Sequence, residues 1–234
     1  MQSDFHPQPP PSESNVPNPA GRTVLVIELS TSSGKIAVVN GGAVLFSRTF
    51  HSERSHNAQL FGPLGDALAE AGDALDLIVV GTGPGSYTGV RIAIAAAQGV
   101  SLSRAVPVIG ISSTLVPEGA AGCDEFCFVG DARRNSFYAA RIRAGAFVEP
   151  VHVLSHDEFR GWLDAKRSLP AFTFEKTVAD ACGARLATPC AESLARHARH
   201  LTPAEVKRLS SLPLEPFYVR EAFITTPKRP WLQV

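Results

Sequence analysis

The chain has 234 residues, and 22 lysines and arginines balance 22 aspartates and glutamates, so its formal net charge at pH 7 is zero. Proteins that coat nucleic-acid phosphates carry a surplus of cations; the balanced charge argues against that class but allows a locally basic face. The 44% hydrophobic and 19% charged residues are typical of a globular protein with a sizeable core. Since no apolar run approaches ~18 residues and no signal peptide is recognisable, we expect a cytoplasmic protein without a membrane span.

The first predicted segment, residues 1–21, is rich in proline among serine, asparagine and glutamine. This composition does not form a packed core and favours extended backbone. We therefore expect a disordered N-terminal arm.

Residues 22–118 form the predicted N-terminal half. The apolar run TVLVIEL from Thr23 predicts a buried strand, and the runs KIAVVN and AVLFSRTF around Gly41-Gly42 predict a hairpin. A helix capped by Ser55 and ended by Gly72 follows, with Pro63 expected to kink or divide it. The strand LIVVG, the loop TGPGSYTG, an alanine-rich helix and the strand PVIGI complete this half.

Residues 119–234 form the predicted C-terminal half. The runs FCFVGDAR, SFYAARIR and AFVEPV repeat the order of the first three strands, and Ser155 with Glu158 forms a capping box for the next helix. Farther along, the pattern is less regular and predicts only a strand near 171–174 and a helix over 191–200. The repeated β-β-β-α order predicts an α/β protein of two related halves, each a mixed sheet flanked by helices.

The glycine-rich string GTGPGSYTGVRI contains neither a dinucleotide fingerprint nor a P-loop, because the required glycine and lysine positions are absent. Two interpretations remain. The glycines either allow the strand and helix to pack closely, or they form an anion-binding loop at the start of a helix. The residues of such a loop would be Gly83, Gly85, Ser86, Thr88, Gly89 and Arg91.

Small residues recur at spacings of three and four along the alanine-rich helix and create a face that another helix could approach closely. The helix after Ser55 could fill this face, or both helices could present a surface to a partner chain. The predicted interface residues are Leu60, Leu64, Leu68, Gly89, Ala93, Ala96, Ala97 and Val100.

The histidines do not form a convincing metal site. His152 and His156 have helical i, i+4 spacing, but the residues between them predict a strand followed by a helix cap, so the rings lie on different elements. His197 and His200 lack an evident acidic partner. The four cysteines are expected to be reduced thiols, and Asp131 with Arg133 is interpreted as an ion pair that fastens the two halves.

Several motifs, in this order, resemble the bacterial TsaB (YeaZ) family. They are VLVIELSTSSGKIAVV, ERSHNAQLFGPL, GTGPGSYTGVRIAIAAAQGVS, PVIGISS, DARRNSFYAAR and PFYVREAF. The resemblance covers most of residues 23–225, and GPGSYTGVRI with its alanine-rich helix is its most specific part. It implies the duplicated fold of actin, sugar kinases and heat-shock ATPases, in agreement with the repeated halves.

The resemblance implies a non-catalytic dimerisation subunit in the synthesis of threonylcarbamoyladenosine in tRNA. The expected partners are a TsaD-type catalytic subunit, which carries the metal, a TsaE-type ATPase and a second copy of the chain. No cofactor is expected on this chain, and tRNA is expected to be reached through the complex. Pairing is implied for the helices over 55–71 and 87–102.

Two departures from related enzymes agree with a non-catalytic role. The resemblance implies a His-x-x-x-His metal pair after the strand at 107–111 in TsaD-like enzymes, where this chain has Ser112 to Val116. Glu28 stands where family members commonly have aspartate. The alternatives are a kinase or carbamoyltransferase that uses Ser86, Thr88 and Asp131, and a metallopeptidase. Lys207, Arg208, Arg220, Lys228 and Arg229 make the C-terminal part the most basic candidate for contact with tRNA.

Overall fold

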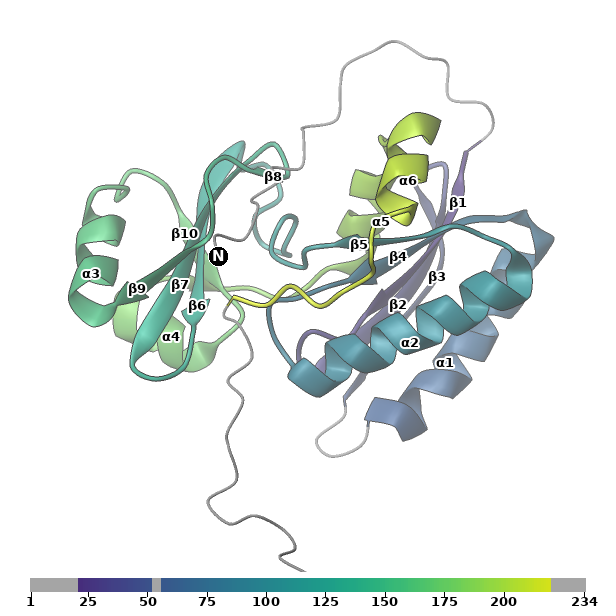
Figure 1. Ribbon diagram of the computed structural model, residues 1–234, viewed down its shortest axis with the longest axis horizontal. Coiled ribbons are helices and arrows are strands. Elements are labelled where there is room, and N and C mark those ends of the chain that lie inside the picture. The colour runs from purple at the N-terminus through teal and green to yellow at the C-terminus, as the bar shows by residue number, and fades with distance from the viewer. Residues whose placement is uncertain (1–20, 52–55, 220–234) are drawn as a thin grey trace, which may run out of the picture.

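The computed structural model describes residues 21–51 and 56–219. The predicted N-terminal arm, the Ser55 cap and the basic residues after 219 lie outside these ranges. Figure 1 shows two β-sheets, each flanked by helices. The prediction of an α/β protein with two mixed sheets is confirmed. No helix within the described ranges is long and apolar enough to cross a membrane.

The first sheet has the strand order β3-β2-β1-β4-β5. The meander β1–β2–β3 is antiparallel, whereas β4 and β5 add parallel strands on the other side of β1. The turn at Gly41 and Gly42, both with positive φ, makes the predicted hairpin. The elements are β1 (Thr23–Glu28), β2 (Ser33–Asn40), β3 (Ala43–His51), α1 (His56–Ala71), the 3-10 turn Gly72–Ala74, β4 (Leu75–Gly81), α2 (Tyr87–Arg104) and β5 (Val108–Ile111).

The second sheet repeats this order. Its strands run β9-β7-β6-β10-β11, with the short β8 also paired to β7. The elements are β6 (Glu125–Asp131), β7 (Ser136–Arg143), β8 (Ala146–Phe147), β9 (His152–Ser155), α3 (His156–Asp164), β10 (Ala171–Thr173), α4 (Lys176–Cys182), β11 (Arg185–Leu186), α5 (Ala191–Arg199) and α6 (Pro203–Ser210). Counted within its own half, each sheet has the order third-second-first-fourth-fifth, which makes the duplication explicit.

Most predicted elements are present, with two differences. The predicted third strand of the second half is divided into β8 and β9, and Pro150, which lacks an amide hydrogen for strand pairing, lies between them. Pro63 lies within α1, which continues from His56 to Ala71 as one helix. The capping box of Ser155 and Glu158 is present at the start of α3.

Both faces of the first sheet are covered by helices. Helices α1 and α2 pack on one face, where Leu60 and Ala93 join Ile27 and Ile78 in a buried cluster. The other face receives α5 and α6, which follow the second sheet in the chain but return to the first (Figure 1). This arrangement explains why β1 and β4 are buried along nearly their whole length.

The apolar cluster beneath α5 and α6 also reaches into the second half. Val26 and Val79 of the first sheet belong to the same cluster as Leu194 of α5, and as Phe126 and Phe128 of the second sheet. A smaller cluster lies under α3 and α4 and includes Val129, Phe159 and Val178. One continuous core therefore joins the two halves.

Candidate functional site

The loop between β4 and α2 packs directly against the loop after β1. The Ser86 amide donates a hydrogen bond of 2.6 Å to the Ser30 carbonyl. A Cβ atom added at Gly85 would collide with that same carbonyl, and one at Gly89 would collide with the Leu29 carbonyl. The two glycines are therefore required for a close approach between backbones.

The amides of Gly83, Ser86 and Gly89 in the predicted anion loop have partners within the chain. The Gly83 amide donates to Ser113 Oγ at 3.1 Å, and the Gly83 carbonyl accepts from Ser112 Oγ at 2.7 Å. Ser86 Oγ accepts from the Gly89 amide at 3.1 Å and caps α2. An anion would have to displace these bonds, so the geometry favours the packing interpretation of the glycines.

Arg91 and Thr88 occupy the outer side of this loop. The Arg91 guanidinium carbon lies 3.3 Å from the centroid of the Tyr87 ring and 5.2 Å from that of Tyr218. Thr88 is exposed. The Phe217 amide donates to the Thr82 carbonyl at 2.8 Å, so the C-terminal segment lies along the glycine loop. Arg91 is engaged with two aromatic rings at the surface.

Glu28 is fully buried at the end of β1, directly beside the glycine loop. Its carboxylate accepts hydrogen bonds of 2.6 Å from the Ser30 amide and from Ser113 Oγ. A Cβ atom at Gly81 would collide with this carboxylate. Burial raises the pKa of Glu28, and the hydrogen bonds from Ser113 and Ser30 offset the rise only in part. The carboxyl group thus occupies the position where the loops converge.

The residues predicted to contact a partner mostly face the interior of this chain. Gly89, Ala93, Ala97 and Val100 of α2 are buried, as are Leu60 and Leu64 of α1. Leu68 and Ala96 are half-buried and pack against the same cluster. The small side chains let the helices lie close to the sheet, so the buried members of this set are not accessible to a partner. This part of the interface prediction requires correction.

The accessible face of α1 and α2 is the opposite one, and sequence periodicity alone did not select it. Phe61 is 63% exposed and Leu102 is 85% exposed. A Cβ atom at Gly62, Gly65 or Gly99 would meet nothing within 4 Å. Glycine inside a helix costs about 1 kcal/mol relative to alanine, and no contact within the described chain requires it at these positions.

The histidines are placed as the sequence predicts. His152 lies on β9 and His156 is the first residue of α3. Their nearest acidic partners differ, since His152 Nε2 lies 3.8 Å from Glu149 and His156 Nδ1 lies 3.6 Å from Asp157. Within residues 21–51 and 56–219, no group of three metal-binding side chains converges.

Asp131 and Arg133 form a local pair rather than a link between the halves. The Arg133 amide donates to Asp131 Oδ1 at 2.7 Å, and its guanidinium lies 3.2 Å from Oδ2. Asp131 is the last residue of β6, and Arg133 lies in the turn that follows it with a positive φ of 65°. The interpretation that this pair fastens the halves is wrong, because a two-residue spacing closes the pair on its own turn.

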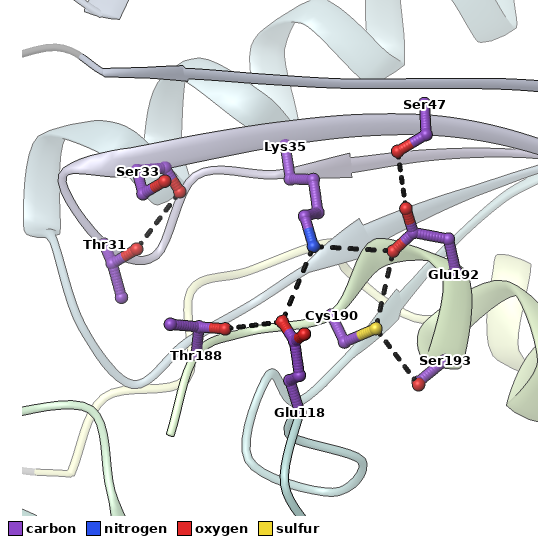
Figure 2. Close-up of polar contacts among 9 residues, drawn as sticks. All are labelled: Thr31, Ser33, Lys35, Ser47, Glu118, Thr188, Cys190, Glu192 and Ser193. Carbon is purple, nitrogen blue, oxygen red and sulfur yellow. Dashed lines mark hydrogen bonds and ion pairs between the residues drawn. The ribbon is translucent and has the colours of Figure 1, made fainter. Parts of the chain in front are cut away.

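A polar network that the sequence did not reveal connects the halves instead (Figure 2). Lys35 Nζ on β2 lies 3.6 Å from Glu192 on α5 and 3.8 Å from Glu118, which precedes the second sheet. Thr188 donates to Glu118 at 2.8 Å, and Ser47 on β3 donates to Glu192. Glu118 and Thr188 also pair through their backbones. Lys35 therefore contacts both chain segments that cross between the halves.

The Glu192 carboxylate is held in its ionised form. Partial burial would raise its pKa, but the hydrogen bond from Ser47, the α5 backbone and the charge of Lys35 outweigh burial, and the pKa is lowered. No sequence pattern indicates this network, because its residues are spread between positions 35 and 192 of the chain. Lys35 is shared by Glu118 and Glu192, so the charged groups of this network are paired with one another and make a structural contact.

With two sheets of the same strand order joined by a common core, the protein is of the duplicated α/β class in which each half is a mixed sheet flanked by helices. A structure from Pseudomonas aeruginosa, described as an uncharacterized protein with similarity to peptidase YEAZ, has a TM-score of 0.66 and 26% sequence identity to it, covering 85% of this chain and 100% of that one. The TsaB proteins of Escherichia coli and Bacillus subtilis, named tRNA threonylcarbamoyladenosine biosynthesis proteins, are 32% and 31% identical over 130 and 121 residues.

These alignments cover 51% and 50% of this chain and 54% and 53% of the two relatives, so the chain spans about half the length of the curated relatives it matches. The family model described as TsaD, tRNA N6-adenosine threonylcarbamoyltransferase, matches residues 47–163, which is half of the chain. The chain belongs to the family that this model describes, and within it to the TsaB (YeaZ) type.

Proposed function

We propose that this protein is a non-catalytic pairing subunit for the synthesis of threonylcarbamoyladenosine in tRNA. Its curated relatives carry that process in their names. The occupied glycine loop supports a role without nucleotide chemistry of its own, because Gly83, Ser86 and Gly89 direct their amides to partners within the chain. We place the protein in the cytoplasm, where tRNA is modified.

The observation that carries the proposal is the outer face of α1 and α2. Exposed Phe61 and Leu102 supply apolar surface, and three glycines with open space above them allow a helix to approach closely. Tyr87 and Arg91, residue types enriched at binding hot spots, lie at the start of α2. We infer that this face, rather than the buried small-residue face, pairs with a TsaD-type catalytic subunit.

The same face could pair with a second copy of this chain, and a TsaE-type ATPase would join the assembly. The metal and the ATP would then belong to those partners. Within this proposal, homodimer and heterodimer compete for one surface, so addition of the catalytic subunit should dissociate any homodimer.

Co-purification tests the proposal. The full chain is expressed with the TsaD-type protein of the same organism, and the complex is measured by size-exclusion chromatography with light scattering. We expect a heterodimer, and we expect Phe61→Asp with Leu102→Asp to abolish it. Leu186→Asp is the matched control, because Leu186 is 58% exposed on the second half. Absence of a heterodimer with the unaltered chain would refute the proposal.

A further inference from the structure

We propose that the outward side of α5 and α6 is a contact surface for the phosphate backbone of tRNA. The basic face is defined here as Arg22, Arg196, Arg199, Lys207 and Arg208. The identification of the RNA as tRNA rests on the proposed function. That the ligand is a polyanion is argued from the charges and positions of these five residues.

The two helices present one surface because both lie on the same face of the first sheet. Helix α5 packs over β1, β2 and β4, and α6 packs against β5. Their apolar residues, such as Leu194 and Val206, point into the core. The remaining sides therefore point away from the sheet in a common direction, above the sheet in the view of Figure 1.

The cations of the basic face are available to a ligand. Arg196, Lys207 and Arg208 are exposed, and in the part of the chain that the structure describes none of them has a carboxylate oxygen within 4.0 Å. Arg22 and Arg199 donate to the carbonyls of Leu201 and Gly41, which are neutral groups, and among the described residues neither guanidinium has a carboxylate oxygen within 4.0 Å. An extended anion could neutralise several of these charges at once.

The acidic groups near these cations are already committed. On α5 and α6 the only acids are Glu192 and Glu205. Glu192 faces Lys35 and Ser47, and Glu205 accepts from the amide and hydroxyl of Thr202 in a capping box, with Arg208 contributing an attractive charge. Asp76, at the start of β4, accepts from the Thr23 amide next to Arg22.

A comparison within the chain shows that this concentration is local. Helix α3 and the turn after it also expose Arg160 and Arg167, but Asp157, Glu158 and Asp164 alternate with them. Mixed charges of that kind give little net attraction for a polyanion. Cations in the last turn also stabilise a helix through its dipole, so the experiment must separate helix stability from RNA binding.

The basic face and the outer face of α1 and α2 lie on opposite sides of the first sheet. A catalytic subunit bound to α1 and α2 would therefore leave the basic face open. This geometry gives the chain two separable contacts, one with the partner protein and one with the RNA. It also reconciles a net charge of zero with a local contact to phosphates.

The test compares two triple variants of the full chain. In the first, Arg196→Gln, Lys207→Gln and Arg208→Gln neutralise the basic face while keeping good helix formers. In the second, Arg160→Gln, Arg167→Gln and Arg185→Gln remove the same charge from exposed positions of the second half. Binding of an unmodified tRNA transcript to the purified heterodimer is measured by fluorescence anisotropy at salt concentrations from about 50 to 200 mM.

We expect the Kd of the basic-face variant for tRNA to be about tenfold higher or more. We also expect the slope of log Kd against log salt to fall by about two to three, because each phosphate that the protein no longer neutralises lowers this slope by about one. The control should match the unaltered chain. Equal tRNA binding by the basic-face variant, with its heterodimer and its melting temperature intact, would overturn the inference. Failure of the unaltered chain to form a heterodimer would instead count against the proposed function.

Discussion

The hydroxyl of Ser113 donates a hydrogen bond of 2.6 Å to Oε2 of Glu28 and joins the end of β5 to the end of β1 inside the first half. Because the pKa of Glu28 is raised, the folded protein binds the proton of the Glu28 carboxyl group more tightly than the unfolded chain does. Below the ordinary glutamate pKa of about 4.3 both states are protonated. As the pH rises from there to the raised pKa, the free energy of unfolding decreases. Above the raised pKa both states are ionised, and the free energy of unfolding decreases no further through this group.

Glu28→Gln therefore tests the cost of the buried charge. The amide cannot ionise, and its oxygen can still accept from Ser30 while its nitrogen donates to Ser113. We expect the free energy of unfolding of the variant to increase relative to that of the unaltered chain as the pH rises from about 4.5 to 8. Urea unfolding at several pH values measures this, with Glu70→Gln on the exposed side of α1 as control. Parallel curves for both chains would contradict the assignment.

Two alanines of α2 separate packing from pairing. Ala93 is fully buried against the sheet, whereas Ala95, two residues later, is exposed. We expect Ala93→Leu to lower the free energy of unfolding by about 1–3 kcal/mol through overpacking. Ala95→Leu should change it by less than about 0.5 kcal/mol and should weaken the heterodimer by obstructing the partner. Urea denaturation and co-purification give the two readouts, and equal effects in both would be inconsistent with the faces assigned here.

Lys35 is expected to contribute to the stability of the joined halves. Lys35→Met leaves Glu192 without its cation, and the side chains of these two residues are only 19% and 16% exposed. We expect a loss of about 1–2 kcal/mol in the free energy of unfolding. Arg48→Met is the control, because the Arg48–Asp66 pair is 51% and 55% exposed and such pairs contribute under about 1 kcal/mol.

A double variant tests the coupling between Lys35 and Glu192. Lys35→Met combined with Glu192→Gln should recover part of the lost stability, because no unpaired buried carboxylate remains. Thermal and urea unfolding of the single and double variants complete the cycle. Strict additivity would show that the two residues act independently.

The glycine loop predicts the behaviour of the isolated chain toward nucleotides. The amides of Gly83, Ser86 and Gly89 have partners within the chain, and the buried Glu28 carboxyl group lies where the loops meet. We therefore expect no saturable heat signal with ATP and Mg²⁺ in calorimetry. A competent kinase of known affinity provides the positive control. Micromolar binding by the full chain would favour the alternative of a nucleotide-dependent enzyme.

The fold could be predicted from sequence to a large extent because its signals are local. The runs of apolar residues identified β1 and β4, and the Ser155 capping box identified the start of α3. The orientation of α2 could not be predicted in the same way. Its two sides carry small residues alike, so the face buried by Ala93 and the face exposed at Ala95 differ only through the position of the sheet.

The contacts between the halves were equally inaccessible to sequence reasoning. Lys35 and Glu192 are separated by more than half of the chain, and nothing in either neighbourhood indicates the other. The sequence interpretation gave that role to Asp131 and Arg133, but these residues are only two positions apart and pair within one turn. Long-range ion pairs depend on the topology and become visible only with it.

The return of α5 and α6 to the first sheet has a consequence for synthesis on the ribosome. Val24, Val26, Val79 and Ile109 remain uncovered until Leu194 and Val206 pack over them. Even the last of these strands, β5, ends at Ile111, 80 residues before α5 begins at Ala191. One side of the sheet therefore stays bare while the second half is made. A nascent chain of this design needs its last helices, or a chaperone in their place, to avoid aggregation.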